Sequence, residues 1–264
     1  MANLEHLALL KAGAVTWIEW RNKNPQISPD LSAANLQGDN LKGANLHSVN
    51  LSKVELGNAL LVQANLSGAD LNGANLKGAI LIEANLSGAN FSVANLSGAT
   101  LTQADLSSAN LIGSDLSEAN LKGAVIADAN LIGTDLRGAN LRDADLGTAK
   151  LTRANLCYAN LIAANLIAAD LSKANLYEAE VMGAYLYKTD LYKANLSNAH
   201  LSGAYLLRAN LSEADLSFAD LRWTNLIGAN LAGANLTGAN LKGANLKGAN
   251  LTDVNLHQTI MPDS

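Results

Sequence analysis

An apolar residue stands at every fifth position from Leu31 to Leu256, and this spacing constrains the fold more than any other feature. Of these 46 positions, 43 are leucine, and the exceptions are Phe91, Ile126 and Val181. The residue two places earlier is alanine in 37 of the 46 units, and the residue between the two is Asn or Asp in 36. The chain therefore repeats the unit A-(N/D)-L-x-x without an insertion from residue 29 to 258.

A five-residue period fits neither a helix nor a flat strand. On an α-helix, successive leucines would advance by about 140° and circle the axis. On a strand, side chains alternate between two faces, so an odd spacing would send every second leucine to the wrong face. A short extended segment followed by a corner solves the problem, because the alanine and the leucine then point inward and the Asn or Asp points outward. The repeat predicts a chain that winds around a core of leucines and alanines.

If one coil has four sides, residues 20 positions apart should stack on one another, and outward residues that recur at this spacing test the expectation. Tyr185 and Tyr205 are one such pair, and Ile112 and Ile132 are another. This spacing favours four sides and about 11 coils, which at the usual strand separation of about 4.8 Å give a rod about 55 Å long.

Units such as Ala239-Asn240-Leu241-Lys242-Gly243 resemble those of the pentapeptide-repeat family, and the resemblance covers residues 29–258. It implies an all-β solenoid: a right-handed quadrilateral parallel β-helix with leucines and alanines inside. The family hosts many roles, so the resemblance indicates the fold more specifically than the function.

Residues 1–28 lie outside the repeat and predict a short N-terminal α-helical cap. Apolar residues at helical spacing, Gly13 and Pro25 indicate two helices, over about residues 3–12 and 14–22. The segment from Leu9 to Arg21 is similar to a leader found before the repeats of bacterial, especially cyanobacterial, family members. Asp39 occupies an inward alanine position near the cap, and we expect it to meet Arg21, a tryptophan N–H or solvent, since an unpaired buried carboxylate is costly.

Residues 259–264 form the predicted C-terminal tail, which is too short for a second helical cap. Two arrangements are open for the last coil. Either Ile260 and Met261 fold over the exposed leucines, or two chains meet end to end as a homodimer, because an uncovered edge invites pairing.

Composition excludes several classes of protein. A formal net charge of −5 argues against nucleic-acid binding, which requires a basic surface. No apolar run is long enough to cross a membrane as a helix, and one cysteine cannot form a disulfide within the chain. We expect a cytoplasmic protein without cofactors.

The sequence predicts no catalytic, cofactor-binding or metal-binding residues. Its four histidines, His6, His47, His200 and His257, lack partners at metal-ligand spacing and are interpreted as isolated surface residues. Cys157 is expected to face outward as an unreactive thiol, because no histidine on its coil can act as its base. Most glycines stand at the second x of the unit, where a corner explains them.

The candidate interaction surface is a group of apolar, tyrosine and basic residues on one predicted side of the rod: Ile167, Tyr185, Tyr187, Lys188, Tyr205, Leu207, Arg208 and Ile227. Phe218, Arg222 and Trp223 are expected nearby. Tyr, Trp and Arg are enriched at protein-binding surfaces. The alternative is that these stacked side chains only strengthen the contact between coils.

Two function classes remain. The first is a non-catalytic structural or interaction module that presents flat faces to an unknown protein partner. The second comes from the resemblance alone: relatives associated with fluoroquinolone resistance mimic duplex DNA and inhibit DNA gyrase, a topoisomerase. The repeat region holds 20 acidic and 15 basic residues, and its runs of negative charge are short and interrupted, so the first class is favoured.

Overall fold

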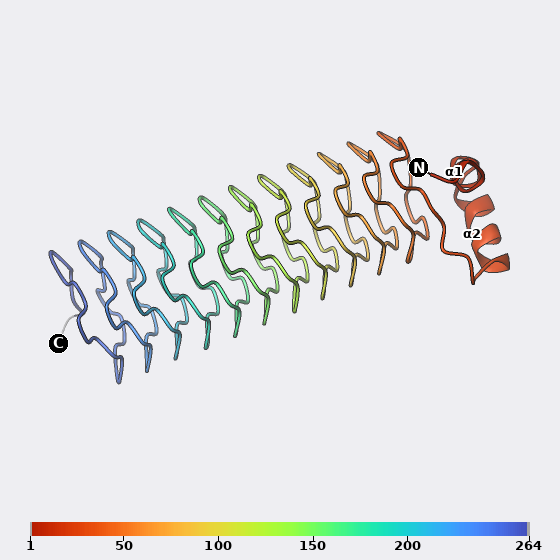
Figure 1. Cartoon of the computed structure of the whole chain (residues 1–264). Coiled ribbons are helices and arrows are strands. Elements are labelled where there is room, and N and C mark those ends of the chain that lie inside the picture. Colours follow the sequence, from red (N-terminus) through yellow and green to blue (C-terminus); the bar gives the residue numbers. More distant parts are fainter. Residues whose placement is uncertain (1, 263–264) are drawn as a thin grey trace.

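The computed structural model describes residues 2–262 and shows a rod of stacked coils with two helices at its N-terminal end (Figure 1). Helix α1 spans Leu4–Lys11 and helix α2 spans Ala14–Lys23, which confirms both predicted helices. Parallel β-bridges join residues 20 apart, from Asp30–Asn50 to Asn240–Ile260. Each coil therefore has four sides, and the fold is the expected right-handed quadrilateral parallel β-helix.

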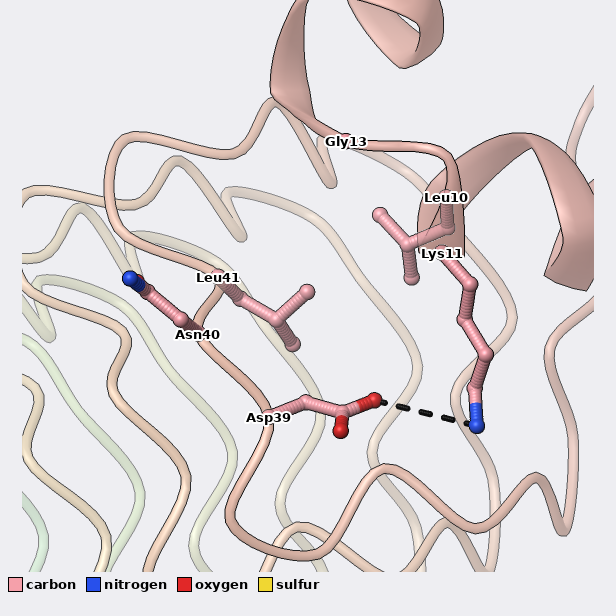
Figure 2. A pocket seen from close by; sticks show the side chains of 6 residues that line it. All are labelled: Leu10, Lys11, Gly13, Asp39, Asn40 and Leu41. Atoms are coloured by element: carbon pink, nitrogen blue, oxygen red, sulfur yellow. Dashed lines mark ion pairs between the residues drawn. The ribbon is translucent and has the colours of Figure 1, made fainter.

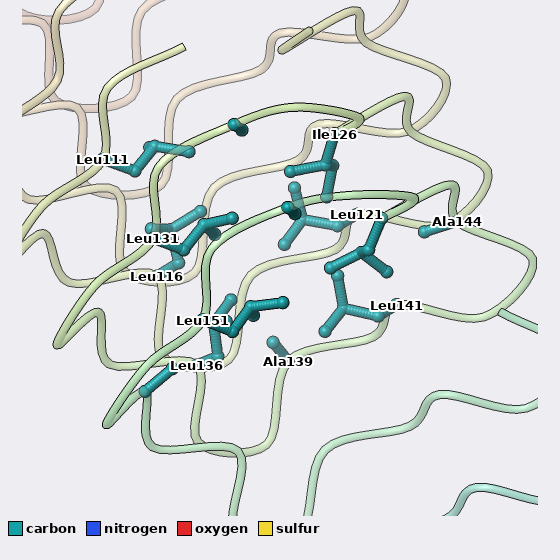
Figure 3. Packing of buried hydrophobic residues seen from close by; sticks show 14 of the residues in the cluster. Leu111, Leu116, Leu121, Ile126, Leu131, Leu136, Ala139, Leu141, Ala144 and Leu151 are labelled. Atoms are coloured by element: carbon teal, nitrogen blue, oxygen red, sulfur yellow. The ribbon is translucent and has the colours of Figure 1, made fainter. Parts of the chain in front are cut away.

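The core is a continuous column of leucines and alanines along the axis (Figure 3). The apolar residue of every unit from Leu31 to Leu241 is buried, and stacked leucines such as Leu111, Leu131 and Leu151 pack on one another. Where a polar residue replaces the inward alanine, its hydroxyl donates to a core-side carbonyl oxygen, as Thr134 does to Leu111 at 2.8 Å. Every inward position before the last coils is therefore either apolar or satisfied in its hydrogen bonding, except Asp39 at the rim of the first coil.

One unit, Asn95–Ala99, shows how the backbone is satisfied. The N–H groups of Asn95, Leu96 and Gly98 donate to carbonyls of neighbouring coils at 2.7–2.9 Å, and that of Ala99 donates to Leu96 across the corner at 3.0 Å. The remaining N–H, on Ser97, donates to Oδ1 of Asn95 at 2.9 Å. The preference for Asn or Asp at the central position follows from this bond, because a short side chain with an acceptor oxygen closes the turn over the next two residues.

Each corner places its second residue in the left-handed region of backbone space. At all 46 such positions φ is positive, from 51° at Val93 to 72° at Gly243. Glycine fills 18 of these corners and other residues fill 28. Glycine adopts this conformation without steric cost, and L-residues adopt it at a cost of about 1–2 kcal/mol.

Helices α1 and α2 cover the first coil. Trp17 is fully buried, and its indole Nε1–H donates to the carbonyl of Asn45 at 2.7 Å. The N–H of Asn3 donates to the carbonyl of Asp30 at 2.9 Å. His6 is also buried, and its Nδ1 accepts the N–H of Asp30 at 3.1 Å. The interpretation of His6 as a surface residue was therefore wrong, because the cap needs an acceptor for the first unpaired N–H of the solenoid.

Asp39 lies at the rim between α1 and the first coil (Figure 2). Its carboxylate is 3.9 Å from Nζ of Lys11 and remains partly exposed to solvent. Arg21 is not its partner, because the guanidinium donates to the carbonyls of Ile27 and His47 at 3.2 and 2.9 Å. The rim position thus allows an acidic residue where alanine is the rule.

The C-terminal coil differs from the first arrangement that the sequence predicts. Ile260 continues the ladder in register with Asn240 and is 53% exposed, and Met261 is also exposed. They do not fold over the last leucines, and Leu256 remains exposed. Extending the ladder satisfies the backbone of the preceding coil, which covering the leucines would not. The end-to-end homodimer stays a prediction, as do the domain boundaries at residues 28 and 258.

Candidate interaction surface

All eight residues of the candidate surface lie on one side of the rod, which we call the tyrosine face. It is the side formed by the units whose middle residue, the Asn or Asp of A-(N/D)-L-x-x, stands at every twentieth position from Asn45 to Asn245. Bridges join Asn165 to Tyr185, Tyr185 to Tyr205 and Tyr205 to Asn225, so four successive coils build the candidate surface. The sequence spacing of 20 thus places these residues correctly.

Tyr185 and Tyr205 form a parallel aromatic stack in the middle of the tyrosine face. Their ring centroids are 5.1 Å apart and the planes differ by 4°. Both residues are nearly half exposed, at 47% and 48%. The stack leaves broad aromatic surface open to solvent, although the two rings also cover part of each other.

A second column runs beside this stack, formed by Ile167, Tyr187, Leu207 and Ile227. Ile167 is exposed and the other three are half-buried. Lys188 bends back over the ring of Tyr187, with Nζ 5.2 Å from the centroid. The two columns together make a flat apolar strip along the rod axis, edged by cations.

The units at Tyr185 and Tyr205 lack the turn-closing hydrogen bond that the neighbouring coils form. The N–H groups of Ile167 and Ile227 donate to Oδ1 of Asn165 and Asn225, at 3.1 and 3.2 Å. Tyrosine has no acceptor near its backbone, so the units at Tyr185 and Tyr205 have no such bond in the described part of the chain. Two adjacent coils of the candidate surface therefore lack this stabilising bond, as do the eight other units without Asn or Asp at the same position.

Trp223 forms the second edge of the tyrosine face, at the corner just before Asn225. It is 63% exposed, and its ring lies over Gly243 of the next coil, where an added Cβ would come within 2.6 Å of the indole. Arg222 lies on the adjoining side, paired with Asp220 at 2.7 Å, and Phe218 lies at that side's far corner. Of the three residues expected nearby, only Trp223 borders the candidate surface.

The charge of the tyrosine face changes sign along the rod. Its coils between residues 104 and 148 carry Asp105, Asp128 and Asp145 and no basic residue. On the same face between residues 184 and 248, the charged residues are all basic: Lys188, Arg208 and Lys247. Within residues 2–262 neither Lys188 nor Arg208 forms an ion pair.

Cys157 is buried, which corrects the expectation of an outward thiol. It is 9% exposed and lies between positions 137 and 177 of the neighbouring coils, which carry the larger residues Arg137 and Tyr177. Burial raises the pKa of the Cys157 thiol. A thiol with a raised pKa is a poor nucleophile, so the residue stays unreactive for a different reason.

Among residues 2–262, no three His, Cys, Asp or Glu side chains converge as metal ligands, and neither helix is long and apolar enough to span a membrane. The pocket beside the cap has a volume of about 270 Å³ and is lined by Leu10, Lys11, Gly13, Asp39, Asn40 and Leu41. Its carboxylate and ammonium groups already face one another (Figure 2).

A four-sided solenoid of five-residue units with a solvent-facing aromatic strip defines a repeat protein that displays side chains on a rigid frame. The model of the family described as pentapeptide repeats matches repeatedly along the chain, over residues 30–61, 59–98, 89–126, 119–156, 149–187, 189–228 and 219–258. The chain belongs to the pentapeptide-repeat family.

Solved structures of similar proteins include two from cyanobacteria. HetL, a pentapeptide repeat protein involved in heterocyst differentiation regulation in Nostoc sp. strain PCC 7120, is 35% identical, with 89% of this chain and 90% of HetL covered and a TM-score of 0.42. Rfr23 from Cyanothece 51142 is 31% identical over 44% of this chain and 63% of its own, with a TM-score of 0.23. QnrB1, a plasmid-mediated fluoroquinolone resistance protein, is 19% identical over 70% of this chain and 83% of its own, with a TM-score of 0.34. Comparison with curated proteins gives no match.

Proposed function

We propose that the protein is a non-catalytic interaction module that binds a protein partner through the apolar strip of the tyrosine face. The rod supplies a stiff frame, and the strip supplies exposed Tyr and Trp surface, edged by Lys and Arg, of the composition found at the centres of protein interfaces.

The loss of two turn-closing hydrogen bonds at Tyr185 and Tyr205 supports this proposal most directly. A net contribution of about 0.5–1.5 kcal/mol is typical of such a bond, and an aromatic pair contributes a similar amount. Stacking can therefore compensate for the lost bonds but gives no clear surplus of stability. Ten of the 46 units lack Asn or Asp at this position, but Tyr185 and Tyr205 are the two among them that place stacked aromatic rings on the surface, nearly half exposed.

The test replaces Tyr187 and Leu207 by serine and compares two measurements. We expect the double variant Y187S/L207S to lose binding of specific proteins captured from a lysate of the source organism. We expect its unfolding free energy to fall by no more than about 1 kcal/mol per site, because both side chains are only half-buried.

A matched control is available on the adjoining side of the same coils. Ile162 and Met182 are also half-buried apolar residues one coil apart. The variant I162S/M182S should retain the captured proteins. The proposal is wrong if Y187S/L207S captures the same proteins as the wild type while its stability falls steeply, since the strip would then only stabilise the rod.

A further inference from the structure

We infer that the partner binds through an acidic amphipathic α-helix that lies along the rod axis on the tyrosine face. This inference rests on the proposed function and adds the chemistry and the shape of the partner segment. Its charge follows from the cations at the edge of the strip, and its shape follows from the spacing of the apolar column.

Two cations without an ion pair among residues 2–262 stack on each other at the edge of the strip. Lys188 and Arg208 stand at the same corner of successive coils, about 4.8 Å apart along the axis. Like charges in directly neighbouring strands repel and destabilise. Contact between coils therefore gives no reason for this pair, whereas carboxylates of a bound segment would neutralise both.

The adjoining side extends the positive region. Beyond the corner of Lys188 and Arg208, its residues between positions 150 and 213 include four basic and three acidic groups: Lys150, Arg153, Lys173, Lys193, Asp170, Asp190 and Glu213. Only Lys193 among these basic residues forms an ion pair in the described range, with Glu213 at 3.2 Å. With Lys188 and Arg208 the region has six basic and three acidic groups, in a chain of net charge −5.

Charge also fixes where along the rod an acidic segment would bind. Asp105, Asp128 and Asp145 occupy the N-terminal half of the same face and would repel it. Attraction at one end combined with repulsion at the other selects a single position, which is how interfaces gain specificity. The expected site is therefore the four coils from Ile167 to Ile227.

The spacing of the apolar column favours a helix over an extended strand. Ile167, Tyr187, Leu207 and Ile227 span three coil intervals, about 14 Å at the strand separation of about 4.8 Å. Three turns of an α-helix cover about 16 Å, whereas three same-face steps of a strand cover about 20 Å. Apolar residues placed one per helical turn thus follow the column within about 2 Å.

The backbone of the rod also disfavours an added strand. In the unit Tyr185–Thr189, the N–H groups of Tyr185, Leu186 and Lys188 donate to carbonyls of neighbouring coils, and that of Thr189 donates to Leu186 across the corner. Among the described hydrogen bonds only the N–H of Tyr187 has no acceptor, and one N–H per unit is not the row of donors and acceptors that an added strand needs. The flat side has no free strand edge for a peptide to pair with. Recognition must therefore use side chains, as a helix on an apolar strip does.

The test selects peptides from a displayed library of random 16-residue peptides against the full chain. We expect enriched sequences with apolar residues at i, i+3 or i+4, i+7 and i+11 and with Asp or Glu along one flank. The affinity of a selected peptide is then measured by fluorescence anisotropy. The variant K188E/R208E should bind it at least about tenfold more weakly, and added salt should weaken binding to the wild type.

The matched control reverses two cations on other sides of the rod. Lys77 and Lys122 are exposed residues of the repeat, and K77E/K122E changes the net charge by the same amount. It should leave the affinity for the selected peptide unchanged. Equal weakening by both double variants would overturn the assignment of the site, because only the overall charge would then matter.

The single variant K188E separates binding from stability. The carboxylate that it introduces lies one coil from Arg208 and should raise the thermal midpoint, while peptide binding weakens. A residue with a purely structural role would move both quantities in the same direction. A lower midpoint together with unchanged binding would overturn the inference.

The remaining outcomes distinguish this inference from the proposed function. Suppose that the selected peptides bind the wild type and do not bind Y187S/L207S. If they lack acidic residues, have the alternating pattern of a strand, or bind K188E/R208E as well as the wild type, the acidic helix is overturned and the interaction module stands. Failure to enrich any peptide sensitive to Y187S/L207S would overturn both. If a 20-base-pair DNA duplex competes with the selected peptide for this site, the ligand is a nucleic acid and the inferred protein segment is overturned.

Discussion

At the scale of the residue, one short side chain and one unusual φ angle explain the repeat. Asn or Asp closes the turn by accepting the next-but-one N–H, as Asn95 does for Ser97. The second corner residue takes a positive φ whatever its identity, as Gly88 (64°) and Val93 (51°) show. The fold therefore imposes the corner conformation on residues that disfavour it.

The first prediction concerns corner strain. The substitution V93G should raise the unfolding free energy by up to about 1 kcal/mol, because a β-branched residue is strained at positive φ while glycine loses somewhat more chain entropy on folding. The reverse change at the preceding corner, G88V, should lower it by about 1–2 kcal/mol, since an added Cβ there meets no atom and only the backbone strain remains. Urea midpoints at constant m-value measure both. Equal midpoints for wild type, V93G and G88V would show that the corner accepts any residue without cost.

At the scale of the element, helices α1 and α2 act as a lid on an otherwise open solenoid. A repeat protein is held together by contacts between neighbours, so its first coil depends on its cap. Trp17 makes the central contact, buried against the first coils and stacked on Trp20 at 5.4 Å. Leu10 of α1 packs into the same core.

The second prediction follows for Trp17. Replacing it by alanine (W17A) should cost about 3–5 kcal/mol locally, because a fully buried indole and its bond to Asn45 are lost. The loss should appear first as faster hydrogen exchange at Leu31, Leu36 and Leu46, while coils near residue 150 keep their protection. The exposed Val15 of the same helix gives the control V15A, which should exchange like the wild type. Uniform loss of protection along the rod would contradict a nearest-neighbour description.

At the scale of the whole molecule, the rod is a rigid frame whose charge varies along its sides. Acidic and basic groups are interleaved over most of the surface, and one stretch of the tyrosine face and its neighbour is basic. Such a distribution does not match the continuous negative charge of a DNA duplex. The DNA-mimic alternative stays a separate prediction, and a gyrase supercoiling assay at micromolar protein decides it.

The third prediction concerns acid stability. The guanidinium of Arg222 holds the pKa of Asp220 below its ordinary value, and the backbone N–H of Ser32 does the same for Asp30. A carboxyl whose pKa is lower in the folded state stabilises the fold above its unfolded pKa, and this stabilisation is lost as the pH falls through the folded value. The thermal midpoint should therefore fall as the pH drops below about 4.

The variant D220N tests the contribution of one ion pair to that pH dependence. Asparagine keeps the acceptor for the N–H of Arg222 but cannot ionise, so the midpoint should be slightly lower than that of the wild type at neutral pH and should decline less in acid. Exposed Asp253 forms no ion pair among the described residues, and D253N should retain the wild-type slope. A D220N slope equal to that of the wild type would show that this pair does not govern acid unfolding.

The sequence alone determined the solenoid, the four-sided coil, the two cap helices and the side on which the candidate surface lies. It could do so because each of these depends on spacing: a leucine every five residues requires a corner in every unit, and matching residues every 20 positions favour four sides. The burial of Cys157 and His6, the pairing of Asp39 with Lys11 and the course of Ile260 were decided by tertiary structure. They depend on the size and reach of side chains from neighbouring coils and from the cap, which a repeat pattern does not specify.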